Sequence, residues 1–191
     1  MSQKLLSDTR LYALLAHIDF ELAADARATG CECGGKLHRA NYPRQPRGGP
    51  KSLSKEWRLR FSFCCASEGC RKRSTPASVR FLGRRVYLGA VVVLLSAMTL
   101  GVTSKRASKL RELVGVSGRT LERWRIWWQK TFPASQVWKE VKARFVPAIE
   151  TSQLPGSLLD RFAMQGDAGG VVAVLELLAP LTTTSYPRRS R

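Results

Sequence analysis

The stretch "CCASEGCRKR" (residues 64–73) places three of the five cysteines of the 191-residue chain within seven residues and follows them with three consecutive cations. Two more cysteines, Cys31 and Cys33, lie upstream. Four thiolates arranged as two separated pairs are what a tetrahedral structural zinc site requires. We therefore expect Cys31, Cys33, Cys65 and Cys70 to bind Zn²⁺, with both pairs at the ends of a sheet too small to be stable alone.

The spacing leaves alternatives open. Zinc ribbons usually separate each pair of cysteines by two residues, whereas the gaps here are one residue and four. Cys64 competes with Cys65 for the third position, and Cys65 is preferred because of its shorter gap to Cys70. His38 is a further candidate ligand. Free buried thiols and a disulfide are the other interpretations of the cluster.

Short strands are predicted around the cysteines. "KLHRANY" (residues 36–42) is one candidate strand, and "SVRFL" (residues 78–82) is a third. Between them, residues 57–63 alternate in period 2, which predicts an aromatic face turned inward and a cationic face, with Arg58 and Arg60, turned outward. Residues 31–83 are thus expected to form a three-stranded zinc-ribbon domain.

Positive charge is concentrated in two segments. Residues 36–85 hold 14 Lys and Arg against 2 acids, and residues 104–130 hold 8 against 2, which accounts for the whole net charge of +18. Arrayed cations of this density favour a nucleic-acid partner, because phosphates bind them with release of counterions. Arg58, Arg60, Arg71, Lys72 and Arg73 are expected to contact the phosphate backbone. A surface that serves only solubility is the alternative.

Residues 86–104 form an uncharged run that is formally long enough to cross a bilayer. Its strongly apolar centre spans only about residues 88 to 100, the length of a buried core helix. We therefore expect residues 84–132 to form a DNA-binding helical bundle, with this run as its buried first helix. A membrane-spanning helix is the alternative, and we favour the buried core helix over it.

The segment "SKLRELVGVSGRTLERWRIWW" (residues 108–128) predicts two helices joined by a tight turn at Gly115, with Ser117 capping the second. Leu121, Trp124 and Trp128 fall on one side of that helix. The predicted DNA contacts are the residues of its exposed side and first turn: Ser117, Arg119, Thr120, Glu122 and Arg123. A helical hairpin with solvated charges is the alternative.

"LRELVGVSGRTLERW" (residues 110–124) resembles the helix-turn-helix of transposase and resolvase-type DNA-binding domains, in which Gly115, Val116, Ser117, Thr120 and Leu121 match the recurring positions. Together with the cysteines, residues 31–130 look like the zinc-ribbon plus helix-turn-helix modules of insertion-sequence transposases and their accessory proteins. The resemblance implies sequence-specific binding to element ends or promoters. Arg111 departs from it, because such motifs usually carry a small residue there.

The remaining segments are predicted to be helical or irregular. A packing helix is expected in residues 1–30, a helical extension in residues 133–180 and a disordered basic tail in residues 181–191. The fold class expected is α+β. The opening "MSQKLLSDTRLYALLAHIDF" has no signal-peptide pattern, which predicts a reducing, cytoplasmic location near the nucleoid.

No catalytic constellation is recognisable in the sequence. Catalytic transposases carry three metal-binding carboxylates on a ribonuclease-H-like domain, and the acids after residue 130 lack the strand context that two-metal chemistry needs. The expected function is non-enzymatic binding of double-stranded DNA, with a homodimer or a catalytic transposase subunit as partner. An accessory or truncated transposase and an RNA-binding zinc ribbon are the rival interpretations.

Overall fold

The computed structural model describes residues 3–49, 53, 55–82, 87–100 and 103–183. Over these residues the chain forms seven α-helices and five short strands, so the fold is mixed α and β, as the sequence predicts. The helices are α1 (Thr9–Thr29), α2 (Gly89–Met98), α3 (Ser104–Val114), α4 (Gly118–Ile126), α5 (Gln136–Val141), α6 (Gly156–Arg161) and α7 (Gly166–Leu178). The strands are β1 (Leu37–Arg39), β2 (Tyr42–Pro43), β3 (Leu59–Arg60), β4 (Phe63–Cys65) and β5 (Arg73–Ser74).

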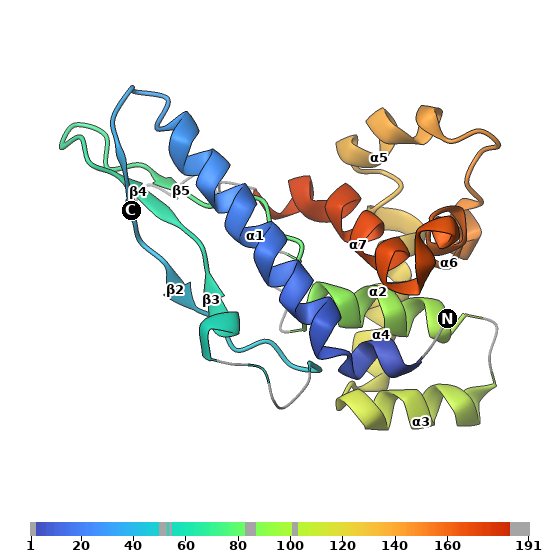
Figure 1. The fold of residues 1–191 in the computed structure, drawn as a ribbon. Helices are drawn as coiled ribbons and strands as arrows, with labels where there is room; N and C mark the ends of the chain where they lie inside the picture. Colours follow the sequence, from blue (N-terminus) through green and yellow to red (C-terminus); the bar gives the residue numbers. More distant parts are fainter. Residues whose placement is uncertain (1–2, 50–52, 54, 83–86, 101–102, 184–191) are drawn as a thin grey trace.

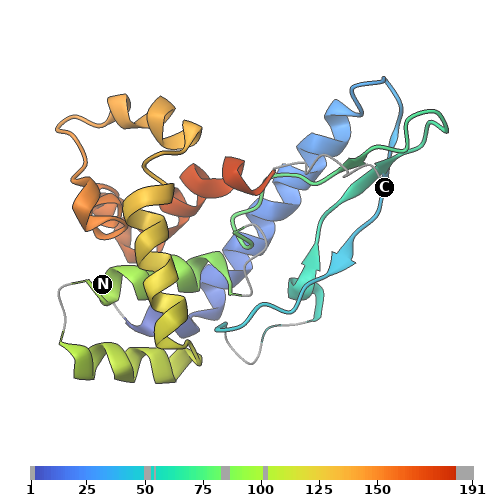
Figure 2. The ribbon, with the colours of Figure 1, turned by 180° about the vertical axis from the view of Figure 1, so that it is seen from behind.

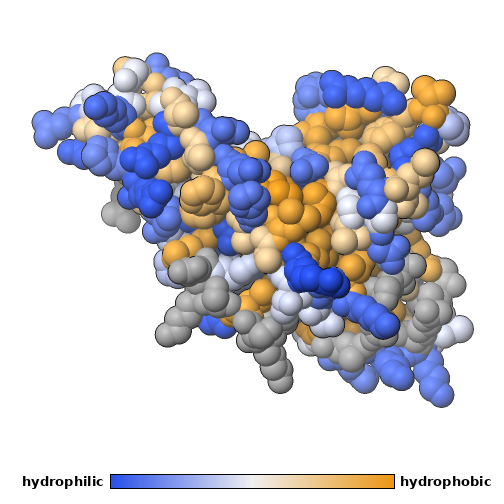
Figure 3. All heavy atoms as spheres, viewed as in Figure 1, coloured by the Kyte–Doolittle hydropathy of each residue, from blue (hydrophilic) through white to orange (hydrophobic). Residues whose placement is uncertain are grey.

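Two parts of the molecule are joined by α1. Strands β1 to β5 and their loops form a sheet lobe, and α2 to α7 form a helical body (Figure 1). Helix α1 runs diagonally from the helical body along the sheet lobe to its far end (Figure 1). Hydrophilic side chains cover much of the sheet lobe, and an apolar surface lies in the hollow between lobe and body (Figure 3).

The sheet lobe contains two small antiparallel sheets. One is three-stranded in the order β1-β4-β5, with Leu37 opposite Cys65 and Phe63 opposite Ser74, and the other pairs β2 with β3. A three-stranded sheet was expected, but the third strand is Arg73–Ser74 and not residues 78–82. Val79 and Phe81 of that segment are buried in the main core without strand pairing to these sheets.

The predicted alternation of inward aromatic and outward cationic side chains along residues 57–63 is wrong for residues 59, 60 and 62. Trp57 is buried but belongs to a 3-10 turn (Lys55–Arg58), and this turn shifts the side-chain parity of the strand that follows. As a result Leu59 is exposed, whereas Arg60 and Ser62 are buried. The cationic face expected at Arg58 and Arg60 therefore keeps only Arg58 at the surface.

Helix α1 has a side-chain cap at its start and a glycine at its end. The Asp8 carboxylate accepts a hydrogen bond from the N–H of Arg10, and the helix ends before Gly30, whose φ of 79° favours glycine. Its buried stripe follows a four-residue spacing: Leu11, Leu15, Asp19 and Ala23. Leu14, by contrast, is 45% exposed.

A buried ion pair fastens α1 to the rest of the chain. Asp19 accepts hydrogen bonds from Arg80 Nε, from the Val79 N–H and from the Ser78 hydroxyl. The guanidinium of Arg80 also donates to the carbonyl oxygens of Trp57 and Leu59. A buried charge is tolerated only when its hydrogen bonds are satisfied. The network therefore fixes the position of the segment after β5 against α1.

Helix α2 lies at the centre of the helical body, with every residue from Gly89 to Ser96 buried. A Cβ at Gly89 would come within 2.9 Å of Leu175 in α7, so α2 and α7 pack at close range. The expectation of a buried core helix near residues 88–100 is thus confirmed. Among the described residues, Ala163–Thr182 is the helical stretch long and apolar enough to cross a membrane, and its Val171, Val174 and Leu175 are packed in the core.

The predicted C-terminal extension is helical. Ser135 caps α5 by accepting from the Trp138 N–H, and α6 and α7 pack on each other and on α2. Leu158, Leu175 and Leu178 join residues of α1, α2 and α4 in one hydrophobic core. Of the tail expected at residues 181–191, Thr182 is buried and accepts from the Ser78 N–H, and residues 184–191 lie outside the described residues.

Candidate metal centre and nucleic-acid interface

The four predicted zinc ligands lie together at the far end of α1. Cys31 and Cys33 follow the end of that helix, and Cys65 and Cys70 flank the turn after β4. The sulfur atoms of Cys33 and Cys65 are 3.4 Å apart, those of Cys31 and Cys70 are 3.7 Å apart, and all four lie within 4.8 Å of one another. Sulfurs at about 2.3 Å from a tetrahedral zinc would be about 3.8 Å apart, so the set fits this geometry.

Two backbone turns bring the sulfurs together. In the first, the N–H of Gly34 donates to the Cys31 carbonyl and the N–H of Cys31 donates to the Gly35 carbonyl. In the second, the N–H groups of Cys70 and Arg71 both donate to the Ser67 carbonyl. A Cβ at Gly35 would lie 2.6 Å from Cys65 Sγ, so only glycine leaves room for the cluster there.

The choice between Cys64 and Cys65 is decided in favour of Cys65. Cys64 Sγ lies outside the cluster and contacts the carbonyl oxygens of Cys65 and Arg71. All five cysteines are free thiols, so the disulfide interpretation does not apply. His38 is opposite Cys64 in the sheet and is not part of the four-sulfur group.

The thiols differ in acidity. The backbone N–H of Gly35 and hydrogen bonds with the neighbouring sulfurs lower the pKa of Cys33 to about 7. At Cys65 the Ser67 N–H favours the thiolate, but burial and the shared hydrogen bonds outweigh it and raise the pKa of Cys65 to about 12. The exposed Cys33 therefore ionises at a lower pH than Cys65 and Cys70, whose pKa values are raised, and thiolate is the form that binds zinc.

The cations after Cys70 are exposed but partly engaged. Lys72 Nζ lies 2.6 Å from a Glu32 carboxylate oxygen, and this contact raises the pKa of Lys72. Arg71 approaches Glu68 at 3.8 Å. Arg73 donates to the Ser62 hydroxyl and the Ala40 carbonyl and stacks over the Tyr42 ring, so its side chain is held in place.

Arg60 does not belong to the exposed basic surface, contrary to the prediction. Its side chain is 2% exposed, and its guanidinium donates to the Pro76 carbonyl. Burial lowers the pKa of Arg60, although the Asp19 carboxylate nearby opposes this shift. A phosphate of a bound polyanion therefore does not reach Arg60 in this conformation.

Helices α3 and α4 are joined by the predicted turn. Gly115 has a φ of 64°, its N–H donates to the Glu112 carbonyl, and the Ser117 hydroxyl accepts from the Thr120 N–H at the start of α4. The Tyr87 hydroxyl donates to the Gly115 carbonyl, and the Tyr87 ring packs edge-on against Trp124. Tyr87 therefore holds the turn against the hydrophobic core.

The side chains predicted to be buried and exposed along α4 are so in the structure, with one exception. Trp124 and Trp128 are buried, and Arg119, Glu122 and Arg123 are exposed. Figure 2 shows α4 on the side of the molecule opposite to that of Figure 1, crossing over α2. Thr120 is the exception, since it is 8% exposed and its hydroxyl contacts Ser117 Oγ and accepts from Arg123, so it supports the first turn.

Two arginines of the helix pair have roles that sequence reasoning missed. Arg125 makes a two-bond ion pair with Glu122 at 2.8 and 2.9 Å. Arg111, at a position where such motifs usually carry a small residue, lays its guanidinium over Gly118, where any Cβ would collide with it. The absence of a side chain at Gly118 was the signal that could have indicated this packing.

The chain was compared with known protein families, curated proteins and solved structures, and none of them matched.

Proposed function

We propose that this protein binds double-stranded DNA, with α4 entering the major groove and the cations near the cysteine cluster contacting phosphates. The observation that carries the proposal is the position of Arg119 and Arg123. Both are exposed on a helix whose opposite side is anchored by Trp124 and whose first turn is capped by Ser117. A helix held in this way can offer cations to base edges with little loss of conformational entropy.

The cysteine cluster has a supporting role in this proposal. Zn²⁺ bound by Cys31, Cys33, Cys65 and Cys70 would tie the end of α1 to the β4 turn. Arg71, Lys72 and Arg73 follow that turn directly, so they would stand on a stiffened base. Such contacts position a protein on DNA without reading the sequence.

The length of α1 relates the two contact regions. Tyr12, near the start of α1, lies in the same core as Tyr87 and Trp124 behind α4, and Cys31 follows the end of α1. At 1.5 Å per residue Tyr12 and Cys31 are about 30 Å apart along α1, which is on the order of the roughly 34 Å of one turn of B-DNA. We infer that the cysteine end contacts phosphates about one turn away from the bases that α4 reads.

The biological setting rests on the resemblance to transposase-type modules alone. In this proposal the chain binds element ends or a promoter, as a homodimer or beside a catalytic transposase subunit, and performs no catalytic step itself. A strand-transfer assay with the isolated chain would contradict this part if it showed activity.

A selection from a random duplex library with the zinc-loaded full chain would supply the binding site. Reversal of both cations, Arg119→Glu with Arg123→Glu, is expected to weaken binding to the selected duplex at least about 30-fold, because each base contact contributes about 1–3 kcal/mol. The matched control is Lys139→Glu with Lys142→Glu, which makes the same change of charge at exposed positions in and after α5. Equal losses from the two pairs would refute groove reading by α4.

Single-stranded RNA is the second candidate, and one groove favours it. Between α1 and the sheet lies a hollow of about 460 Å³ lined by Phe20, Phe61, Arg27 and Arg39, with Phe20 53% exposed. Aromatic rings beside cations are a stacking platform for unpaired bases. A preference for single-stranded RNA over the selected duplex, removed by Phe20→Ala, would replace the DNA proposal.

A further inference from the structure

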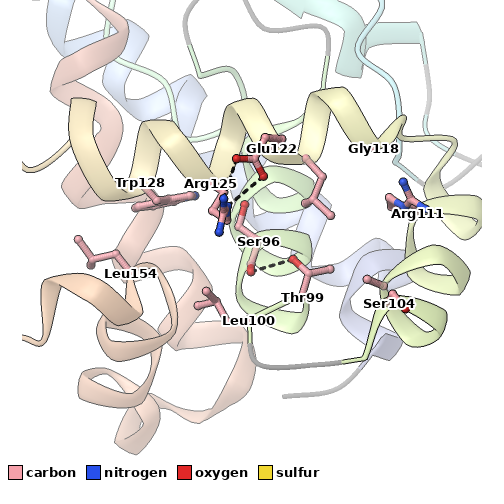
Figure 4. A pocket seen from close by; sticks show the side chains of 12 residues that line it. Ser96, Thr99, Leu100, Ser104, Arg111, Gly118, Glu122, Arg125, Trp128 and Leu154 are labelled. Atoms are coloured by element: carbon pink, nitrogen blue, oxygen red, sulfur yellow. Dashed lines mark hydrogen bonds and ion pairs between the residues drawn. The ribbon is translucent and has the colours of Figure 1, made fainter.

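A pocket of about 300 Å³ lies behind α4, enclosed by α2, α3 and α4 and closed on one side by Leu154 (Figure 4). Its apolar wall is formed by Leu100, Leu121 and Leu154. The volume is at the lower end of the range for small-molecule sites, about 300–1,000 Å³. A ligand with a short apolar body would fit this space.

Three buried polar atoms of the pocket lining have no hydrogen-bond partner among the described residues: Ser96 Oγ, Arg111 Nε and Trp128 Nε1. Trp128 is 1% exposed and Ser96 is 6% exposed. Figure 4 shows the ring nitrogen of Trp128 turned toward the guanidinium of Arg125. Because an unsatisfied buried donor destabilises the fold, Ser96 Oγ and Trp128 Nε1 indicate that a ligand at this end of the pocket supplies the missing partners.

The chemistry of these atoms selects the ligand. Trp128 Nε1 and Arg111 Nε can only donate, and Ser96 Oγ can donate or accept. Arg111 and Arg125 bring two positive charges to the pocket and Glu122 brings one negative charge. The lining thus has a net charge of one positive unit and more hydrogen-bond donors than acceptors. A ligand group with one negative charge and several acceptor atoms complements both properties, and a carboxylate is such a group.

We propose that this pocket binds a small organic acid, with its carboxylate toward Trp128 and Arg125 and its apolar body against Leu100, Leu121 and Leu154. The pocket lies between α4 and the helices that support it, so the inference deepens the proposed function by assigning an effector site behind the DNA-contacting helix. The binding itself does not depend on DNA and can be tested without it.

The test uses the zinc-loaded full chain and two pairs of probes, benzoate with benzamide and phenylacetate with phenylacetamide. Binding is followed by the NMR signal of the Trp128 indole N–H, which is assigned by its loss in Trp128→Phe. We expect saturable shifts of this signal with the two acids, at least tenfold weaker binding of the two amides, and no shift of the Trp57 indole signal.

Arg125→Met keeps the aliphatic stem but removes the guanidinium, and it is expected to weaken binding of the acids at least tenfold. Arg144→Met makes the same change at an exposed position outside the pocket and is expected to leave binding unchanged. The proposal is overturned if the amides bind as tightly as the acids, if no probe shifts the Trp128 signal, or if the two variants lose equal affinity. Failure of DNA binding in the duplex assay would leave each of these readouts intact, so the two proposals can fail separately.

Discussion

Arg80 Nε donates a 2.7 Å hydrogen bond to Asp19 Oδ2 in a position where both side chains are at most 2% exposed. Asp19 comes from the middle of α1, and Arg80 comes from the segment that leads from the sheet lobe into the helical body. The Arg80 guanidinium also lies over the rings of Trp57, Phe61 and Phe81 at 5.0–5.3 Å from their centroids. The pair therefore joins three parts of the chain that are far apart in sequence.

Removal of one partner of this pair should destabilise the fold strongly. Asp19→Ala leaves the Arg80 charge buried and unpaired, so we expect the free energy of unfolding to fall by about 3–5 kcal/mol in urea denaturation. Replacement of both partners, Asp19→Leu with Arg80→Met, should cost less than Asp19→Ala alone. Glu21→Ala on the exposed side of the same helix is the control, with an expected change of at most about 0.5 kcal/mol.

Zinc content should distinguish the adjacent cysteines 64 and 65. Cys65→Ser removes a sulfur of the four-cysteine cluster, so metal analysis of the purified protein is expected to show zinc largely lost. Cys64→Ser removes a thiol that contacts only backbone carbonyl oxygens in the described structure, and its zinc content should equal that of the unmodified chain. The reverse pattern would contradict the assignment of the third ligand.

Alkylation of the zinc-free protein should reach Cys33 before Cys65. This thiol is exposed and its pKa is lowered to about 7, so its reaction rate with iodoacetamide should rise between about pH 6 and 8 and level off above. Cys65 is buried with a pKa raised to about 12, so it should stay largely unmodified over this range. Peptide mapping at several pH values checks the order, and zinc should protect Cys33 because a bound thiolate is not free to react.

The cysteine cluster and the helix turn could be predicted because their signals are local. Four soft ligands in two pairs predict a thiol cluster that could hold a metal, and Gly115 followed by Ser117 predicts a turn and a cap within three residues. The burial of Arg60 could not be predicted in this way. It depends on the 3-10 turn before β3 and on the carbonyl oxygen of Pro76, which no local pattern reveals.

The place of the third strand was missed for a related reason. Strand pairing is a contact between distant residues, and β5 has only two residues, too few for a period-2 signal. Residues 78–82 carry Val79, Phe81 and Leu82 around Arg80, and they are buried in the core instead of pairing in the sheet. Asp19 on the apolar stripe of α1 was an available signal for that burial, since a carboxylate at such a position requires a buried cation as partner.

The salt dependence of DNA binding should separate Arg58 from Arg60. If the exposed Arg58 contacts one phosphate, Arg58→Ala should reduce the slope of log K against log salt by about 0.9, whatever the duplex sequence. The buried Arg60 should show the opposite behaviour, because Arg60→Met would lower the free energy of unfolding but leave the slope unchanged. Equal changes of slope for both variants would place Arg60 at the surface in the complex.

Occupation of the pocket behind α4 should change DNA affinity. Gly118, Leu121, Glu122 and Arg125 of α4 line it together with Ser96 and Leu100, from α2 and just beyond its end, so a ligand there holds α4 against its support. We expect saturating phenylacetate to tighten binding of the selected duplex, and by linkage the duplex must tighten phenylacetate binding by the same factor. The measurement is a duplex titration with and without phenylacetate, and Arg125→Met should remove the difference. A duplex affinity that does not respond to phenylacetate, in a protein that binds it, would show that the pocket is not coupled to α4.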